Sequence, residues 1–384
     1  MAKAGLAMVG KYIATVSTGL EKISAGEVSE KFKSISTRHQ GKIVFQSDQS
    51  VDQILKLKSI CNLYVCIYEE TLDKDELPSD SKGLEALLFK IAEKCDWATG
   101  IDKWRQSSKF DLSSEKILIK DEDMTSQQPK FRVSCNRFGA EHKFTSPEVC
   151  STFGHVLDTK FGWPISMKNY DLEVYVNITS CYFNVCFTLS PTSLDRRNVV
   201  SLGFTTLRAA TCYALLRVAQ IQRGDIFLDP MAGSGAIPVE CCASNYDEWA
   251  AYTLAGEINP KSLAKCKTNL DNFQSSPSDS IQLDVTHLPL RSNSIDVLVS
   301  DLPFGKRHGT KHINRTLYPA LLSEMARVAR RSTGRAVLLT LDFKSINLAY
   351  DENRHLWSQK SCDFVKVGNL NCYMYLFLRN DSEV

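Results

Sequence analysis

The chain has 384 residues, of which 43% are hydrophobic, and a formal net charge of +2. This length and composition allow two or three globular domains with real cores. The nearly neutral charge excludes a polycation that binds nucleic acid through bulk charge alone, and no apolar run approaches the roughly 18–20 residues that span a bilayer.

The N-terminal elements alternate between strand-like and helix-like patterns. Strands are predicted at residues 12–18, 41–45 and 63–68, and helices at residues 19–33 and 51–57. The apolar start of the first strand is too short and too mixed for a secretory signal. The order β-α-β-α-β indicates a small ferredoxin-like domain.

A second α/β unit follows a polar loop and an amphipathic helix, at residues 73–82 and 84–94. Residues 111–130 are mostly charged or polar, so we expect them to be exposed, with a short apolar run at residues 117–119. The unit is completed by predicted strands and one helix, at residues 131–135, 171–178 and 182–189 and at residues 147–160. Residues 190–203 are predicted to be a connector.

The pattern changes at Thr205, after which helices and strands alternate regularly. This alternation indicates a doubly wound, mostly parallel sheet. Its strands are predicted at residues 226–228, 251–255, 281–284, 295–301 and 336–341. A terminal hairpin at residues 363–368 and 372–378 is typical of class I methyltransferases rather than of dinucleotide-dependent dehydrogenases.

The chain contains thirteen cysteines and no CxxC pair. Cys61 and Cys66, like Cys181 and Cys186, lie five residues apart in predicted strands, so each pair projects to opposite faces. This spacing does not suit a metal site, and free thiols indicate a reducing compartment. We therefore expect no metal and a cytoplasmic location, with the nucleus as the alternative.

Residues 224–240, GDIFLDPMAGSGAIPVE, place a glycine turn between a strand and a helix. The strand ends at Asp229, and Gly233 and Gly235 let backbone N–H groups approach a ligand. Pro238 stands where a dinucleotide-binding fingerprint has its third glycine. We expect a side chain at Gly235 to enter ligand space without unfolding the protein.

Two further acids end the next strands of the predicted sheet. Glu257 can bond the hydroxyls of a ribose, and Asp284 can accept a hydrogen bond from an adenine amino group. Each acid alone is better explained as a surface cap, whereas the ordered set predicts S-adenosylmethionine as the cofactor. The residues expected to bind it are Asp229, Met231, Gly233, Ser234, Gly235, Ala236, Glu257, Ile258, Asp284, Val285, Thr206 and Leu207.

The fourth strand ends in the four residues predicted to be catalytic, Asp301, Leu302, Pro303 and Phe304. An exocyclic amine is a weak nucleophile because its lone pair is delocalised into the ring. The Asp301 carboxylate and the Leu302 carbonyl can each accept one of its N–H groups. Pro303 stiffens the turn, and Phe304 offers a face to a flipped base. The alternative is an ordinary strand-to-loop turn with a buried phenylalanine.

Amine methyltransferases usually carry proline at the position of Leu302. The carbonyl survives this change, so we expect Leu302→Pro to be tolerated. No Pro-Cys dipeptide occurs, which argues against methylation of cytosine C5 through a thiolate. Adenine N6 stays open as a target, because the same four residues would serve it.

Residues 301–335 carry eight Lys or Arg and two acids, an excess that suits phosphate contacts. A solvated helix face explains the same run equally well. The predicted RNA contacts are Arg132, Arg137, Lys143, Arg196, Arg197, Lys306 and Arg307. The alternative for each of them is a surface salt bridge.

Residues 131–149, FRVSCNRFGAEHKFTSPEV, resemble the THUMP RNA-binding module. The whole chain resembles the THUMP-domain tRNA guanine-N2 methyltransferases. The likeness is carried by DPMAGSGAIPVE, NVVSLGFTTLR, DLPFGKRHGTK and TGRAVLLTLD. It departs from the family where Ala232 and Ser234 replace Cys and Thr, and where an acidic insert is short or missing in residues 111–130.

The resemblance implies a class I Rossmann-like methyltransferase domain preceded by ferredoxin-like and THUMP α/β domains. The expected divisions are residues 1–110 (ferredoxin-like domain and start of the THUMP region), 111–189 (THUMP domain), 190–204 (linker) and 205–384 (methyltransferase domain). It implies S-adenosylmethionine-dependent formation of N2-methylguanosine near position 6 of the tRNA acceptor stem. The implied partners are tRNA and a small zinc-binding activator subunit, without a membrane. The other alternative is a catalytically inactive RNA-binding protein, against which the retained glycines and acids argue.

Overall fold

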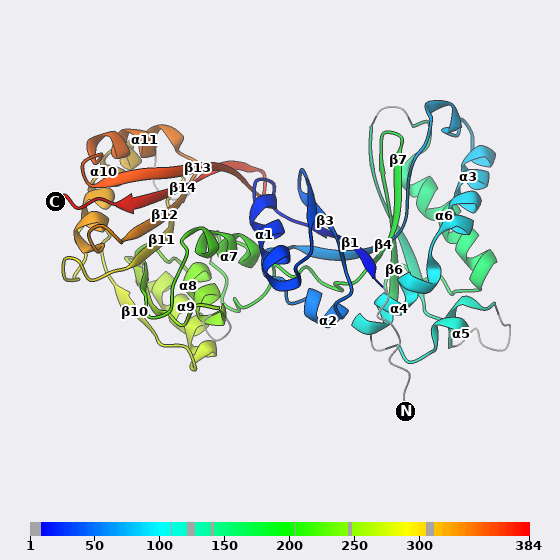
Figure 1. Ribbon diagram of the computed structural model, residues 1–384, viewed down its shortest axis with the longest axis horizontal. Coiled ribbons are helices and arrows are strands. Elements are labelled where there is room, and N and C mark those ends of the chain that lie inside the picture. The colour runs from blue at the N-terminus through cyan, green and yellow to red at the C-terminus, as the bar shows by residue number, and fades with distance from the viewer. Residues whose placement is uncertain are drawn as a thin grey trace.

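The computed structural model describes residues 9–108, 110–120, 127–139, 142–203, 205–244, 248–304 and 311–384. Two halves, each built on one seven-stranded sheet, lie side by side along the long axis (Figure 1). We call residues 9–189 the N-terminal half and residues 205–384 the C-terminal half. Within the described ranges, no helix is both long and apolar enough to cross a membrane.

The first part of the N-terminal half has the strand order β2-β3-β1-β4, with β1 antiparallel to both neighbours. This is the predicted ferredoxin-like arrangement. Its elements are β1 (Gly10–Thr15), α1 (Glu21–Phe32), β2 (Ser36–His39), β3 (Lys42–Ser47), α2 (Val51–Ile54) and β4 (Asn62–Thr71). The sequence analysis did not predict β2, and in this respect it was wrong. This edge strand reads STRH and buries no side chain, so it carries no hydrophobic pattern.

The second part extends the same sheet through β7, β6 and β5. Its elements are α3 (Ser81–Lys94), α4 (Trp97–Ser107), α5 (Ser114–Leu118), β5 (Phe131–Phe138), α6 (Ser146–Phe161), β6 (Leu172–Thr179) and β7 (Tyr182–Thr188). The long strand β4 pairs with β1 at one end and with β7 along the rest, so both parts share one sheet.

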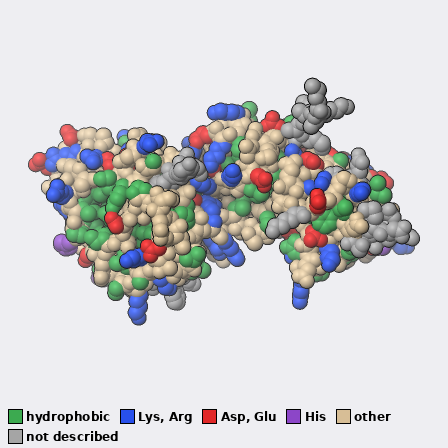
Figure 2. Space-filling view, turned by 90° about the horizontal axis from the view of Figure 1, so that it is seen from below, with side chains coloured by type: hydrophobic (Ala, Val, Ile, Leu, Met, Phe, Trp, Pro, Cys, Tyr) green, Lys and Arg blue, Asp and Glu red, His purple; other side chains and the backbone are tan. Residues whose placement is uncertain are grey.

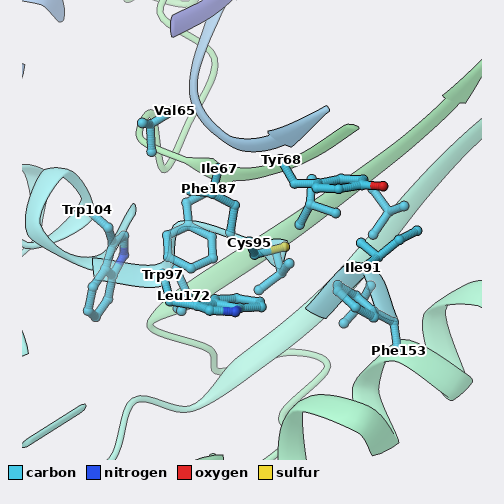
Figure 3. Close-up of a cluster of buried hydrophobic side chains, with 14 of the residues drawn as sticks. Val65, Ile67, Tyr68, Ile91, Cys95, Trp97, Trp104, Phe153, Leu172 and Phe187 are labelled. Atoms are coloured by element: carbon cyan, nitrogen blue, oxygen red, sulfur yellow. The ribbon is translucent and has the colours of Figure 1, made fainter. Parts of the chain in front are cut away.

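Aromatic side chains fill the core between this sheet and its helices (Figure 3). The Trp97 ring lies 5.1 Å from that of Phe161 and 6.0 Å from that of Trp163, between ring centroids. The Trp163 indole N–H donates to the Ile117 carbonyl over 2.7 Å, and Ile117 is fully buried. The apolar run at residues 117–119 therefore contributes Ile117 to the core, whereas Ile119 is exposed.

The C-terminal half has the strand order β10-β9-β8-β11-β12-β14-β13, in which β14 runs antiparallel to both of its neighbours and the other six strands share one direction. This order confirms the predicted doubly wound sheet with a terminal hairpin. Its strands are β8 (Ile226–Asp229), β9 (Tyr252–Glu257), β10 (Ser278–Gln282), β11 (Val297–Asp301), β12 (Arg335–Thr340), β13 (Trp357–Val367) and β14 (Leu370–Arg379). Its helices are α7 (Ala209–Val218), α8 (Ala236–Ser244), α9 (Pro260–Leu270), α10 (Lys311–Val328) and α11 (Phe343–Glu352).

Polar contacts join the two halves. The Lys31 ammonium lies 3.0 Å from the Glu248 carboxylate, and the Lys366 amide N–H donates to the Thr18 carbonyl over 2.8 Å. The tip of the β13–β14 hairpin accordingly reaches the N-terminal half beside α1 (Figure 1). These contacts hold the sheets of the two halves in a defined relation.

Candidate active site

Three acids end three neighbouring parallel strands of the C-terminal sheet. Asp229 is the last residue of β8, Glu257 of β9 and Asp301 of β11, and β8 pairs with both of the other strands. Because the carboxyl ends of parallel strands meet at one edge of a sheet, the three carboxyl groups share that edge. This is the edge at which open α/β sheets bind ligands.

The glycine turn after β8 is tied to the end of β9. The Ala232 N–H donates to the Gly256 carbonyl over 2.8 Å, and the Gly233 N–H donates to Glu257 Oε2 over 2.9 Å. Gly233 and Gly235 adopt φ of +57° and +87°, which L side chains rarely do. The local sequence therefore needs glycine at both positions.

The two glycines face different surroundings. A Cβ built on Gly233 meets no atom within 4 Å, so this position opens toward the ligand edge. A Cβ built on Gly235 would lie 2.6 Å from Cys266 Sγ, because the turn packs there against α9. The expectation that a side chain at Gly235 enters ligand space is wrong, since that space is protein core.

Glu257 and Asp284, the two acids predicted to bind the ribose and the adenine, accept different hydrogen bonds. Glu257 Oε1 accepts from the Asn259 N–H over 2.8 Å while Oε2 accepts from Gly233. Asp284 is exposed, and its Oδ1 accepts from the N–H and hydroxyl of Thr286, which lowers the pKa of Asp284. The third strand ends at Gln282, earlier than predicted, so Asp284 lies two residues beyond it. Both acids stay at the ligand edge.

The remaining predicted cofactor residues surround the turn. Thr206 Oγ1 lies 3.2 Å from Ser234 Oγ, so the segment before α7 lies on the glycine turn. Ala236 begins α8, and Met231 and Leu207 are partly buried against the core clusters of the C-terminal half. Val285 is buried, whereas Ile258 is 59% exposed. Hydrogen bonds thus place Thr206 and Glu257 against the glycine turn.

Asn269 is a functional candidate that the sequence patterns did not reveal. Its buried amide donates to the Ser234 carbonyl over 2.8 Å and to the Ser201 carbonyl over 2.9 Å. It therefore joins the connector to the glycine turn. An asparagine inside a helix gives no recognisable signal, so only the folded contacts identify it.

The buried Asp229 and the half-buried Asp301 end adjacent strands. Asp229 Oδ1 accepts from the Ser300 hydroxyl over 2.8 Å and from the Met231 N–H over 3.1 Å. Burial raises the pKa of Asp229 to about 7 against these hydrogen bonds, and the Glu257 charge adds to the increase. Burial and then the Asp229 charge raise the pKa of Asp301 well above its usual range.

One carboxyl oxygen of Asp301 is free to accept a hydrogen bond from a ligand. Its Oδ1 atom is buried and, within the described part of the chain, has no hydrogen-bond partner. A buried acceptor without a donor costs free energy, on the order of 1–3 kcal/mol. Such an atom at the ligand edge is suited to a donor that arrives with the substrate, such as an amine N–H.

The loop after Asp301 is held by side chains that no motif predicted. The Pro303 carbonyl accepts from Asn314 Nδ2 over 3.0 Å and from the Tyr318 hydroxyl over 2.7 Å. Tyr318 also contacts Thr340 Oγ1 at 2.9 Å, and all three side chains are fully buried. They lie too far along the chain from the loop to form part of a local motif.

The structure explains why leucine, and not proline, occupies position 302. The Leu302 N–H donates to the Leu339 carbonyl over 2.9 Å, and its side chain is buried in the core. Proline lacks this N–H, so the expectation that Leu302→Pro is tolerated is wrong. Phe304 is partly buried and packs against the same core cluster as Leu207.

The predicted RNA contacts are not equally available. Arg132 bonds Glu173 at 2.7 Å and lies over a tyrosine ring, while Arg137 Nη1 lies 3.2 Å from His142 Nδ1. Lys143 and Arg196 are exposed, whereas Lys306 and Arg307 lie outside the described residues.

Arg197 and four arginines of the basic run at residues 301–335 form ion pairs within the protein. Arg197 donates to the Lys58 carbonyl over 2.7 Å and to the buried Glu240 carboxylate over 2.5 Å, which fixes the connector. The arginines at the end of the basic run each have an acidic partner, namely Arg327, Arg330, Arg331 and Arg335 with Glu324, Asp296, Glu383 and Asp225. Among the predicted RNA contacts, the salt-bridge alternative holds for Arg132 and Arg197.

Comparison with protein families places this geometry in context. The family described as "RMKL-like, methyltransferase domain" matches residues 196–372, and the THUMP domain matches residues 105–185. The crystal structure of TrmN from Thermus thermophilus has a TM-score of 0.76 at 21% identity, over 96% of this chain and 99% of that chain. At that identity the likeness shows a shared fold.

Two curated relatives align over most of the chain. The Mus musculus protein named tRNA (guanine(6)-N(2))-methyltransferase THUMP3 is 33% identical over 95% of this chain and 88% of its own length. The Bos taurus protein named U6 snRNA (guanine-N(2))-methyltransferase THUMPD2 is 26% identical over 91% of this chain and 80% of its own length. Both relatives are named for the same chemistry on different RNAs.

Proposed function

Because this chain belongs to the family of THUMP-domain tRNA guanine-N2-methyltransferases, we propose that it methylates the N2 amine of a guanosine in tRNA. The observation that carries the proposal is the buried, unpartnered Asp301 Oδ1 at the edge that also holds the glycine turn. The relative named for guanine 6 of tRNA supports a target near position 6 of the acceptor stem.

The residues at the ligand edge suit S-adenosylmethionine. Gly233 leaves open space beside the turn, Glu257 presents its carboxylate at the end of β9, and Asp284 presents its carboxylate two residues beyond the end of β10. Their acceptors suit the ribose hydroxyls and the adenine amine of the cofactor. When bound, this cofactor supplies an electrophilic methyl group on a sulfonium.

The chain's own residues prepare the amine. Asp301 Oδ1 and the Leu302 carbonyl accept its two N–H groups and turn the nitrogen lone pair toward the methyl carbon. The bound cofactor would supply the methyl group to this nitrogen, and the methylated amine would release one proton to solvent. Asn314 and Tyr318 hold the Pro303 carbonyl, so the loop keeps its geometry during transfer.

Mass spectrometry of nucleosides from methylated RNA tests the proposal. Unmodified tRNA should yield N2-methylguanosine when incubated with the protein and cofactor, and sequencing should place it near position 6. U6 snRNA serves as the comparison substrate because one relative is named for it. N6-methyladenosine in place of N2-methylguanosine would contradict the proposal.

We expect cofactor affinity to rise with pH because Asp229 must ionise near a cation. Its pKa is raised to about 7, so it is largely protonated at lower pH. The dissociation constant for S-adenosylmethionine should therefore fall between about pH 6 and about pH 8, by up to about tenfold. The pKa of Asp229 is higher in the folded protein than in the unfolded chain, so its protonation stabilises the unliganded fold at low pH. This stabilisation is lost as the pH rises through the folded pKa of about 7.

Isothermal titration at several pH values measures this dependence. Asp229→Asn is the matched control, since it keeps the size of the side chain and removes the ionisation. A wild-type dissociation constant that does not change with pH, or an equal slope in Asp229→Asn, would assign the titration to another group.

We expect tRNA affinity to fall steeply with salt, because RNA phosphates release counterions when cations bind them. Exposed Lys143 and Arg196 are the described candidates. Figure 2 also shows Lys and Arg side chains gathered where the two halves meet. Replacing Lys143 with alanine should reduce the slope of log affinity against log salt by about one charge. Filter binding between low and physiological salt checks this, and a flat wild-type slope contradicts it.

We also propose that a small zinc-binding activator subunit docks on the C-terminal half. The resemblance to the family suggests this partner. Co-expression followed by activity assays with and without the subunit tests the proposal. Full activity of the isolated chain would contradict it.

A further inference from the structure

An exposed aromatic patch lies on the C-terminal half, formed by Phe343, Phe364 and Tyr373. Phe343 and Phe364 are 45% and 41% exposed. The Tyr373 ring lies 4.9 Å from the Phe343 ring and 6.2 Å from the Phe364 ring, between centroids. Large exposed rings in contact with one another commonly mark a binding surface.

The patch exists because α11 covers only part of its sheet face. Phe364 and Tyr373 are paired across β13 and β14, and side chains two residues apart share a face. Farther along that face, Tyr375 and Phe377 are fully buried, and Tyr350 of α11 contacts Phe377 at 5.4 Å between centroids. The rings at the hairpin tip remain uncovered.

The aromatic patch lies at the same sheet edge as the catalytic loop. Tyr373 pairs with Thr340, the last residue of β12, and Asp301 pairs with Leu339 one residue earlier. Phe343 directly follows Asp342, whose Oδ2 accepts from Asn314 Nδ2 over 3.1 Å. The same amide nitrogen donates to the Pro303 carbonyl, so a short chain of contacts joins the patch to the loop.

Positive charge surrounds the rings. Lys344 follows Phe343, and Lys366 lies two residues after Phe364 on the same face of β13; both are exposed. Exposed Lys22 lies in α1, near Gly19, which packs closely against the Phe364 carbonyl. In the described part of the chain none of these three lysines forms a salt bridge, so they are available to phosphates.

We propose that the aromatic patch stacks unpaired bases of the substrate RNA beside the target nucleotide. Aromatic rings flanked by lysines are the usual platform for unpaired nucleotides, because every base has a face that can stack. A guanine drawn out of a stem leaves its neighbours partly unstacked, and rings at this edge can replace the lost contacts. The inference rests on the proposed function, since it concerns the same RNA.

Paired substitutions separate stacking from simple apolar contact. The double variant Phe343→Leu with Phe364→Leu keeps apolar surface but removes two ring faces, whereas Phe343→Trp with Phe364→Trp keeps them. We expect the leucine variant to bind tRNA on the order of 10-fold more weakly, and the tryptophan variant to bind about as well as wild type. Leu348→Ala, which changes an equally exposed residue of α11, is the control and should have no effect.

Fluorescence titration of labelled tRNA gives the affinities, and melting curves and S-adenosylmethionine titration confirm intact folding. Wild-type affinity in the leucine variant, or equal weakening in both double variants, would overturn the proposal. Binding needs no turnover, so these results stand even if the protein fails to form N2-methylguanosine. That failure would count against the proposed function alone.

Discussion

Replacing Asp301 with alanine should lower the turnover number for tRNA methylation by about 10²–10³-fold, by analogy with the loss of one preorganised catalytic hydrogen-bonding group. The reason is that Oδ1 of Asp301 is buried at the ligand edge without a partner among the described residues, ready for an amine N–H. Both dissociation constants should stay nearly unchanged, because this atom contacts a small part of either ligand.

Single-turnover kinetics with saturating cofactor and tRNA measures the effect. Asp301→Asn is the matched variant, since it keeps one acceptor oxygen and should lose less activity than Asp301→Ala. Thermal stability should not fall in either variant, because burial, and then the Asp229 charge, raise the pKa of Asp301 and disfavour its carboxylate. Near-normal turnover in Asp301→Ala would remove the proposed mechanism.

The parts of this site that the sequence predicted are local in the chain. Asp229 and Asp301 each end a short apolar run, and buried parallel strands read as such runs. The glycine turn follows its strand directly, so strand, turn and helix could be placed together. These features depend on neighbours in sequence, which a pattern can record.

The parts that escaped prediction depend on contacts between distant segments. Asn314 and Tyr318 act on Pro303 through the fold, and Asn269 reaches the glycine turn from α9. Arg197 was expected at the RNA surface, yet its guanidinium bonds the buried Glu240 carboxylate. Sequence periodicity and spacing do not distinguish an arginine that pairs with a buried acid from an arginine that is free on the surface.

Replacing Gly235 with valine should destabilise the C-terminal half by about 2–5 kcal/mol, the sum of overpacking and left-handed backbone strain. Its Cβ would lie 2.6 Å from Cys266 Sγ, and its φ is +87°. Gly233→Ala is the informative comparison, because that position has a similar backbone strain but open space. We therefore expect Gly233→Ala to weaken cofactor binding with a much smaller loss of stability.

A second substitution identifies the atom responsible. Cys266→Ala removes the sulfur nearest to the new Cβ, so it should restore part of the stability of Gly235→Val. The restoration should be incomplete, since the backbone strain at a φ of +87° stays. Melting temperatures of the four combinations give the coupling between the two sites. An unchanged melting temperature in Gly235→Val, with cofactor binding lost, would show that the side chain enters ligand space rather than the contact with α9.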